Sequence, residues 1–153
     1  MSVSILKVSE DETFEISTPK VGIKNYPAGF EWVWFLIAPE GRQVQLAFET
    51  FELEQSTDCV NDYLEVRETV SVNPEFPTVS FDGVYGTILS KPVCGTNKPT
   101  TIQSTGNKMW VHFKSDSNIS TTYKGFKASF KAGVYDNHIV VLLNGVSKSF
   151  FAY

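Results

Sequence analysis

The sequence lacks the residue patterns on which most enzymes depend. It contains only two histidines, His112 and His138, and neither belongs to an H-E-x-x-H zinc motif. It has no G-x-S-x-G nucleophile motif and no glycine-rich phosphate loop. His112 falls inside a run that predicts a strand, where a histidine usually has a structural role. These absences argue against catalysis by this chain alone.

Long apolar segments are also missing. The longest uninterrupted apolar run near either end covers residues 139–143, far fewer than the roughly 20 residues of a membrane-spanning helix. The first fifteen residues are rich in Asp and Glu and have no apolar region typical of a secretory signal. We therefore expect no transmembrane span, and either a signal that has been removed or a fragment of a longer protein.

Basic residues are too few and too scattered for a nucleic-acid surface. The 13 Lys and Arg are outnumbered by 17 Asp and Glu, and the formal net charge is -4. Phosphate binding needs clustered positive charge, so we expect no nucleic-acid partner. A length of 153 residues, with 42% hydrophobic and 20% charged residues, is typical of one soluble globular domain.

Several short runs alternate apolar and polar residues, which predicts strands with one face on a core. Turn residues separate these runs, and no window of eleven or more residues keeps a helical period. The pattern favours an all-β sandwich or barrel. The clearest runs are 43–48, 62–67, 109–113 and 125–132.

Two further segments differ from these strands. Residues 68–91 contain interrupting prolines and glycines, which predicts a long loop or an extra hairpin. At the C-terminal end, Asn144 and Gly145 separate two β-prone runs, a strong hairpin signal. We therefore expect a domain over residues 1–132 and a hairpin-like extension over residues 133–153, which packs on the domain or begins a neighbouring one.

The most informative motif is E-x-x-x-x-C-x-x-D, formed by Glu54, Cys59 and Asp62. It lies within a longer set of motifs that occur in a fixed order. This set is N-Y-P at 25–27, Trp34, A-P-E-G at 38–41, the motif itself, C-G at 94–95, F-K-S-D-S-N at 113–118 and G-F-K-A at 125–128.

Together these motifs resemble the CUB domain family over roughly residues 15–132. The resemblance implies an extracellular, jelly-roll-like sandwich of two antiparallel sheets. It also implies a non-catalytic module, because the chain resembles the CUB modules that accompany astacin-type, tolloid-type and complement-type proteases. Residues 31–67 look much like the tail domains of astacin-type enzymes.

The two cysteines by themselves are compatible with one disulfide or with two buried thiols. The resemblance implies a disulfide between Cys59 and Cys94, and an oxidising, extracellular location with it. CUB domains usually carry a first disulfide as well. Here Trp32 stands where one of its cysteines would be, a departure that some calcium-binding members share.

Resemblance to the calcium-binding branch implies a Ca²⁺ site. Ca²⁺ takes six to eight oxygen ligands from adjustable loops. The implied ligands are Glu54, Asp62 and Asp116, with Ser117 and Asn118 supplying a carbonyl, a side chain or a water. Without the resemblance, these carboxylates would be interpreted as ordinary solvated loop residues.

Further roles follow from the same resemblance. Tyr26 is expected to hydrogen-bond the ligand carboxylates and orient them. The outward-facing acidic oxygens are expected to accept a Lys or Arg of a partner protein, and Asp58 and Asn61 add to that surface. Asn118 also begins the chain's only glycosylation sequon. A glycosylated Asn118 would not serve as a side-chain ligand.

An alternative is a calcium-independent adhesive or carbohydrate-binding CUB sandwich. In that case Phe30 and Trp32 are candidate platforms for a sugar ring. Alternatively, Trp32 fills the space left by the missing disulfide. Partner binding that persists in chelator would favour this alternative.

Overall fold

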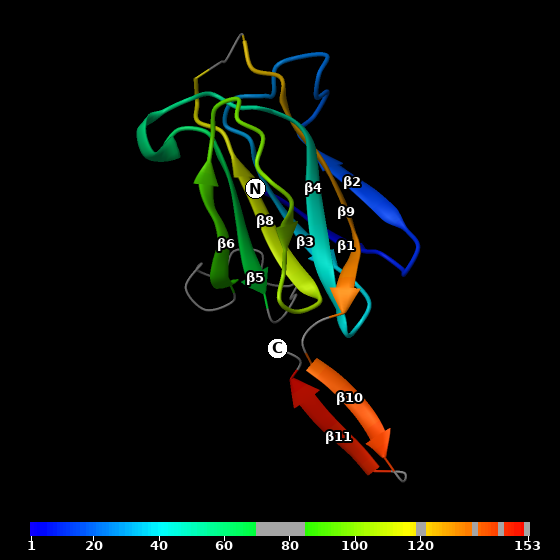
Figure 1. Cartoon of the computed structure of the whole chain (residues 1–153). Coiled ribbons are helices and arrows are strands. Elements are labelled where there is room, and N and C mark those ends of the chain that lie inside the picture. The colour runs from blue at the N-terminus through cyan, green and yellow to red at the C-terminus, as the bar shows by residue number, and fades with distance from the viewer. Residues whose placement is uncertain (70–84, 119–121, 136–137, 144–145, 152–153) are drawn as a thin grey trace.

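The computed structural model describes residues 1–69, 85–118, 122–135, 138–143 and 146–151. Almost all regular structure in these residues is β-strand, with one short 3₁₀ turn, η1 (Thr57–Cys59) (Figure 1). The strands are β1 (Ser2–Lys7), β2 (Thr13–Ser17), β3 (Glu31–Ile37), β4 (Arg42–Glu52), β5 (Tyr63–Thr69), β6 (Tyr85–Val93), β7 (Ile102–Gln103), β8 (Lys108–Lys114), β9 (Gly125–Tyr135), β10 (His138–Leu143) and β11 (Val146–Phe151).

Two sheets form the sandwich that the sequence predicts. The five-stranded sheet has the order β1-β3-β8-β5-β6, and the four-stranded sheet has the order β2-β9-β4-β7. Neighbouring strands in these sheets run antiparallel except β1 and β3, which are parallel. The parallel pair is possible because β2 lies between them in sequence but belongs to the other sheet.

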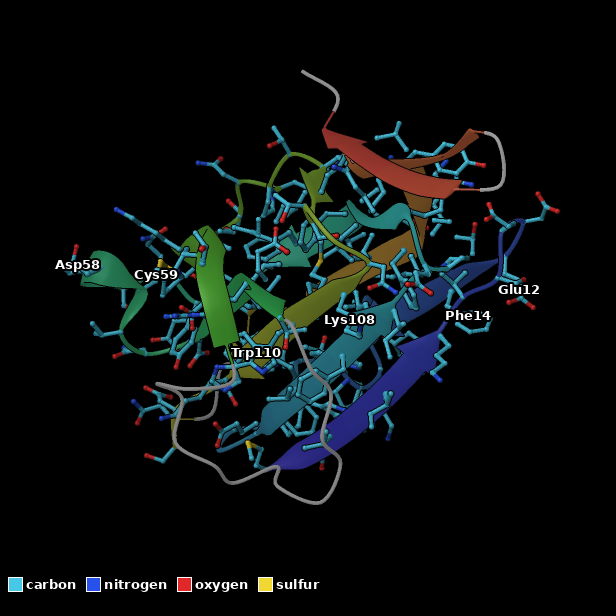
Figure 2. The ribbon with its side chains drawn as sticks, turned by 90° about the horizontal axis from the view of Figure 1, so that it is seen from below. Glu12, Phe14, Asp58, Cys59, Lys108 and Trp110 are labelled. Carbon is cyan, nitrogen blue, oxygen red and sulfur yellow. A yellow bond between two sulfur atoms is a disulfide. The ribbon has the colours of Figure 1, made fainter. Side chains whose placement is uncertain are left out.

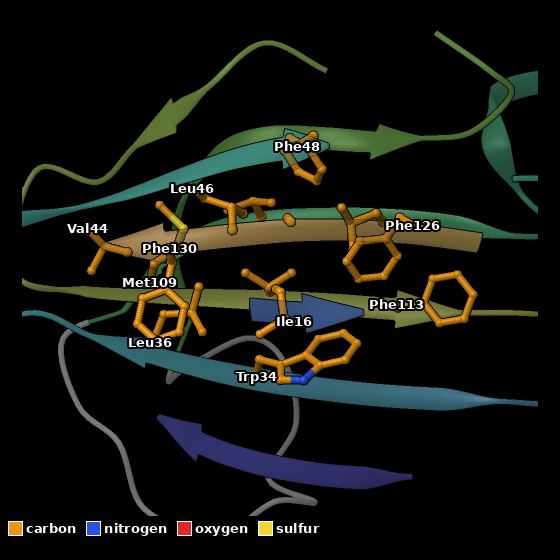
Figure 3. Close-up of a cluster of buried hydrophobic side chains, with 14 of the residues drawn as sticks. Ile16, Trp34, Leu36, Val44, Leu46, Phe48, Met109, Phe113, Phe126 and Phe130 are labelled. Carbon is orange, nitrogen blue, oxygen red and sulfur yellow. The ribbon is translucent and has the colours of Figure 1, made fainter. Parts of the chain in front are cut away.

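The core lies between the two sheets and follows the period of two along each strand (Figure 3). On β8 the side chains of Met109, Val111 and Phe113 are fully buried, and on β9 Phe126 and Phe130 face them from the opposite sheet. The rings of Phe113 and Phe126 are 5.8 Å apart between centroids. This aromatic core fixes which face of each strand points inward.

The outer face of the five-stranded sheet carries a second, smaller apolar cluster. Val33, Phe35 and Trp110 are all less than 4% exposed, with Val3 packed beside them. Consequently both faces of β3 are buried, and its sequence E-W-V-W-F-L-I shows no alternation. This explains why the pattern of the sequence did not single out β3.

The observed strands extend the predicted ones. The four alternating runs fall within or next to β4, β5, β8 and β9, and β9 continues past Ala132 to Tyr135. Of the irregular segment 68–91, residues 68–69 end β5 and residues 85–91 belong to β6, which pairs antiparallel with β5. Residues 70–84, on which the predicted loop or extra hairpin mostly falls, lie outside the described residues.

The C-terminal strands β10 and β11 form a two-stranded antiparallel sheet of their own, as the sequence predicts. The Asn144–Gly145 turn itself lies outside the described residues. Figure 1 shows the hairpin at the end of β9, opposite the loops that join β4 to β5 and β8 to β9. Among the described residues, no helix is long and apolar enough to cross a membrane.

The predicted disulfide between Cys59 and Cys94 is confirmed, with the two Cα atoms 5.5 Å apart. It joins η1 to the segment that follows β6.

Breaking the disulfide should lower the free energy of unfolding by about 4 kcal/mol, since the unfolded chain regains the entropy of an open loop. Urea unfolding of the Cys59→Ser/Cys94→Ser protein, compared with the oxidised and reduced parent, measures this loss. Equal stability of all three would contradict it.

His112 gives a second prediction, for the pH dependence of stability. It is 2% exposed on the outer face of β8, with its Nε2 atom 2.9 Å from Glu31 Oε1. Burial lowers the pKa of His112 below 6.5, and the contact with Glu31 opposes this shift only in part. As the pH falls through 6.5, the unfolded chain binds a proton before the folded chain does, so stability should decrease.

His112 alone can change the free energy of unfolding by at most about 1.4 kcal/mol per pH unit. Chemical unfolding between about pH 8 and pH 5.5 avoids the range in which ordinary carboxylates titrate. The His112→Gln protein should lack this component of the slope. An unchanged slope in the variant would show that other groups cause the pH dependence.

Candidate metal centre

Three carboxylates meet at one end of the sandwich. Glu54 follows β4, Asp62 precedes β5 and Asp116 follows β8. One oxygen atom of each lies within 4.8 Å of the others, and together they form a group that could hold a metal ion. The structure thus brings together the three residues that the sequence predicts as carboxylate ligands. We call these residues the acidic group.

Strand pairing explains why these residues meet. Tyr63 at the start of β5 pairs with Lys114 at the end of β8, so the residues just beyond this pair come close together. The backbone N–H of Asp116 donates a hydrogen bond to Asp62 Oδ1, with a length of 2.8 Å. β4 ends in the facing sheet at the same end of the sandwich and brings Glu54 to them.

Tyr26 contacts two members of the acidic group, one through its carboxylate and one through its backbone. Its hydroxyl donates a 2.5 Å hydrogen bond to Asp62 Oδ2 and accepts one of 2.9 Å from the backbone N–H of Glu54. The ring is 4% exposed and packs edge-on against Phe113. Burial and the neighbouring Asp62 carboxylate raise the pKa of Tyr26, so its hydroxyl stays protonated and keeps donating.

The loop that carries Tyr26 is fixed to Asp116 by contacts that the sequence did not reveal. Ser115 is buried, and its Oγ atom donates to Pro27 O and accepts from the N–H of Phe30. The N–H of Gly29 donates to Asp116 O. Gly29 has a φ of 63°, a left-handed conformation that glycine adopts without strain. These residues position the loop without touching the acidic group's carboxylates.

No ion pair among the described residues balances the charge of the acidic group. Asp62 is 1% exposed, whereas Glu54 and Asp116 are half-buried. The ion pairs found in the described residues involve none of these three carboxylates. Carboxylates this close repel one another, and a divalent cation would relieve the repulsion. The oxygen-only donor set fits Ca²⁺, which prefers carboxylates on loops.

Ser117 and Asn118, the other predicted ligands, are both exposed and directly follow Asp116. The backbone N–H of Asn118 donates to Asp116 Oδ1, and its side-chain amide donates to Asp116 Oδ2 at 3.0 Å. Asn118 therefore holds the Asp116 carboxylate in place. Ile119 and Ser120, which complete the sequon, lie outside the described residues.

The two residues predicted to contact a partner lie in the disulfide loop. Asp58 is exposed within η1, and Figure 2 shows it at the margin of the molecule beside Cys59. Asp58 does not belong to the acidic group. Asn61 is half-buried next to Asp62, and its N–H donates to Ser56 Oγ.

The two candidate sugar platforms are engaged in packing. Trp32 stacks on Trp34 with 5.7 Å between ring centroids, and its Nε1 atom donates to Ser4 Oγ. Phe30 packs against both Trp32 and Phe113. Both side chains are only partly buried, and both pack against the main core. This arrangement favours the interpretation that Trp32 fills space and attaches β1 to the sandwich.

Comparison with known proteins identifies the family. The model of the CUB domain matches residues 7–130. This chain belongs to the CUB family. CUB domains are non-catalytic modules that mediate protein–protein interactions in extracellular proteins, so the chain is not an enzyme in its own right.

Individual relatives agree with this assignment. Human Tolloid-like protein 1 is 32% identical over 117 residues, which cover 76% of this chain but only 10% of that protein. The CUB1-EGF-CUB2 domains of rat MASP-1 are 28% identical, with a TM-score of 0.62 over 84% of this chain and 42% of theirs. The MASP-1 CUB2 domain bound to Ca²⁺ shares the fold, with a TM-score of 0.62 and 21% sequence identity. The match covers 82% of this chain and 96% of that domain.

The role of Tyr26 leads to a prediction about stability in the absence of metal. Tyr26→Phe removes the hydroxyl that donates to buried Asp62, which should lower the free energy of unfolding by about 1 to 3 kcal/mol. Urea unfolding in chelator measures this effect.

Tyr63→Phe is the matched control, because the hydroxyl of Tyr63 has no hydrogen bond within the described residues. Its effect should stay within about 0.5 kcal/mol. Equal losses in the two variants would mean that Tyr26 contributes through its ring alone.

Proposed function

We propose that this chain is an extracellular module that binds Ca²⁺ at the acidic group and, with the metal in place, recognises a basic side chain of a partner protein. The single observation that carries the proposal is the acidic group itself. Its three carboxylates are within 4.8 Å of one another, and none forms an ion pair in the described part of the chain.

Glu54, Asp62 and Asp116 would supply carboxylate oxygens to the metal, and Ser117 or Asn118 would supply a carbonyl. Bound Ca²⁺ would contribute positive charge that neutralises these carboxylates and orders the loops that carry them. Tyr26 and the N–H of Asp116 already hold Asp62 in one orientation, so part of the site is formed before the metal arrives. The calcium-bound MASP-1 CUB2 domain supports the compatibility of this fold with Ca²⁺.

Partner recognition would use oxygens at the accessible side of the same group. Glu54 and Asp116 are half-buried, so each can accept a hydrogen bond from outside the protein. A Lys or Arg contact with a partly buried carboxylate is charge-assisted and stronger than one with a solvated carboxylate. Asp58, exposed on the disulfide loop, and the neighbouring Asn61 would add polar contacts around it.

An extracellular location and a place within a larger protein are supported by one observation each. The chain contains a disulfide, which persists in oxidising compartments. Its relatives are multidomain proteins of which it spans about a tenth or less. We therefore place this module within a larger secreted or cell-surface protein, where another domain performs any catalysis.

Thermal unfolding with calcium and with chelator tests the metal site. At the affinity typical of extracellular calcium modules, with a Kd on the order of 10⁻⁴ to 10⁻³ M, about 10 mM Ca²⁺ should stabilise the fold by up to about 2.7 kcal/mol. The corresponding rise in Tm is roughly 5 to 10 °C. The rise should disappear in Asp116→Asn, which keeps the shape of the side chain but removes its charge.

Asp11→Asn makes the same change of charge at an exposed turn between β1 and β2 and should keep the full rise. A rise that survives in Asp116→Asn would place any calcium elsewhere. No rise in the parent protein would leave the calcium-independent alternative, which then predicts that partner binding persists in chelator.

A further inference from the structure

A pocket of about 290 Å³ lies in the loop that carries Tyr26. Its walls are Pro19, Lys20, Lys24, Asn25 and Pro27. Two of these residues, Asn25 and Pro27, are the chain neighbours of Tyr26, whose hydroxyl contacts Asp62. The same short loop therefore forms the pocket and contacts the acidic group.

The chemistry of the pocket is opposite to that of the acidic group. The N–H of Lys24 donates to Lys20 O, and both exposed lysines line the pocket. The proline rings and the aliphatic stems of the lysines are apolar, while the ammonium groups and the Asn25 amide are polar. The pocket thus combines an apolar floor with positive charge.

The positive charge of this loop is available to a ligand. No ion pair of the described chain includes Lys20 or Lys24. A third exposed lysine, Lys124, lies on the neighbouring segment, where its carbonyl accepts a hydrogen bond from the N–H of Gly22. Local positive charge on a chain with a net charge of -4 is a specific feature of this surface.

We propose that this pocket binds a glutamate or aspartate side chain of the same partner that presents Lys or Arg to the acidic group. The inference rests on the proposed function and narrows it, because the partner would carry a basic and an acidic residue close together. A single carboxylate with an apolar stem fits two lysines and two prolines. A sulfated glycan fits less well, since its repeated sulfates need an extended basic track, whereas the pocket presents two lysines.

Capped peptides provide the probe. One has a single lysine among glycines, a second has a single glutamate among glycines, and a series combines the lysine with a glutamate at each position two to four residues away. Kd values and amide chemical shifts are measured by NMR on the ¹⁵N-labelled protein with calcium. At least one combined peptide should bind about fivefold more tightly than the lysine peptide. The glutamate peptide alone should shift the amides of Lys20, Lys24 and Asn25.

A double variant separates this pocket from the acidic group. Lys20→Gln/Lys24→Gln should remove the fivefold gain and leave the Kd of the lysine peptide nearly unchanged. Lys7→Gln/Lys131→Gln changes the net charge equally, at exposed positions on β1 and β9, and should keep the gain.

Each remaining outcome has one meaning. If the lysine peptide binds with calcium but no glutamate position improves it, or the gain survives in Lys20→Gln/Lys24→Gln, the pocket proposal is wrong and the proposed function stands. If the lysine peptide does not bind, the proposed function fails and the joint recognition by the two sites fails with it; amide shifts with the glutamate peptide would then show only that the pocket binds a carboxylate by itself. A heparin-derived hexasaccharide that shifts these amides while the glutamate peptide does not would overturn the pocket proposal in favour of a sulfated glycan.

Discussion

The hydroxyl of Tyr26 joins the two sheets at one end of the sandwich. It donates to Asp62, which precedes β5 of the five-stranded sheet, and accepts from Glu54, which follows β4 of the four-stranded sheet. Because the ring is buried against Phe113, the hydroxyl has little freedom to leave this position. The geometry of the acidic group thus depends on the same aromatic packing that forms the core.

This arrangement explains how a site with unbalanced charge can exist at the edge of an apolar core. Asp62 is almost completely buried, yet two donors reach its carboxylate, Tyr26 OH and the N–H of Asp116. Asp116 in turn receives two hydrogen bonds from Asn118. The protein therefore offsets part of the cost of burying the Asp62 carboxylate with two neutral donors.

Most of the sandwich could be predicted from the sequence, because strands with one buried face alternate visibly and β4, β5, β8 and β9 are of this kind. β3 could not, since Trp34 and Leu36 face the core while Val33 and Phe35 are buried on the outer face. The strands β1 and β2 lie in a region rich in acidic residues, where β2 exposes most of its side chains. Their positions are set by pairing with β3 and β9, contacts that local patterns do not encode.

The candidate site likewise contains some residues that could be predicted from the sequence and others that could not. The resemblance to CUB domains pointed to Glu54, Asp62, Asp116 and Tyr26, which the structure brings together. It did not point to Ser115, whose hydroxyl is one of many in the sequence and acquires its role only from the approach of Pro27 and Phe30. The pocket beside Tyr26 was also missed, because lysines and prolines on a loop carry no signal until the fold gathers them.

The way in which β1 is attached has a mechanical consequence. It is attached to the sandwich by backbone hydrogen bonds to β3, the contact from Trp32 to Ser4 and the packing of Val3 and Leu6, whereas the covalent cross-link lies between Cys59 and Cys94. Tension applied through the N-terminal strand would therefore load non-covalent bonds first. β1 would detach first, while the segment enclosed by the disulfide could not lengthen until that bond was reduced.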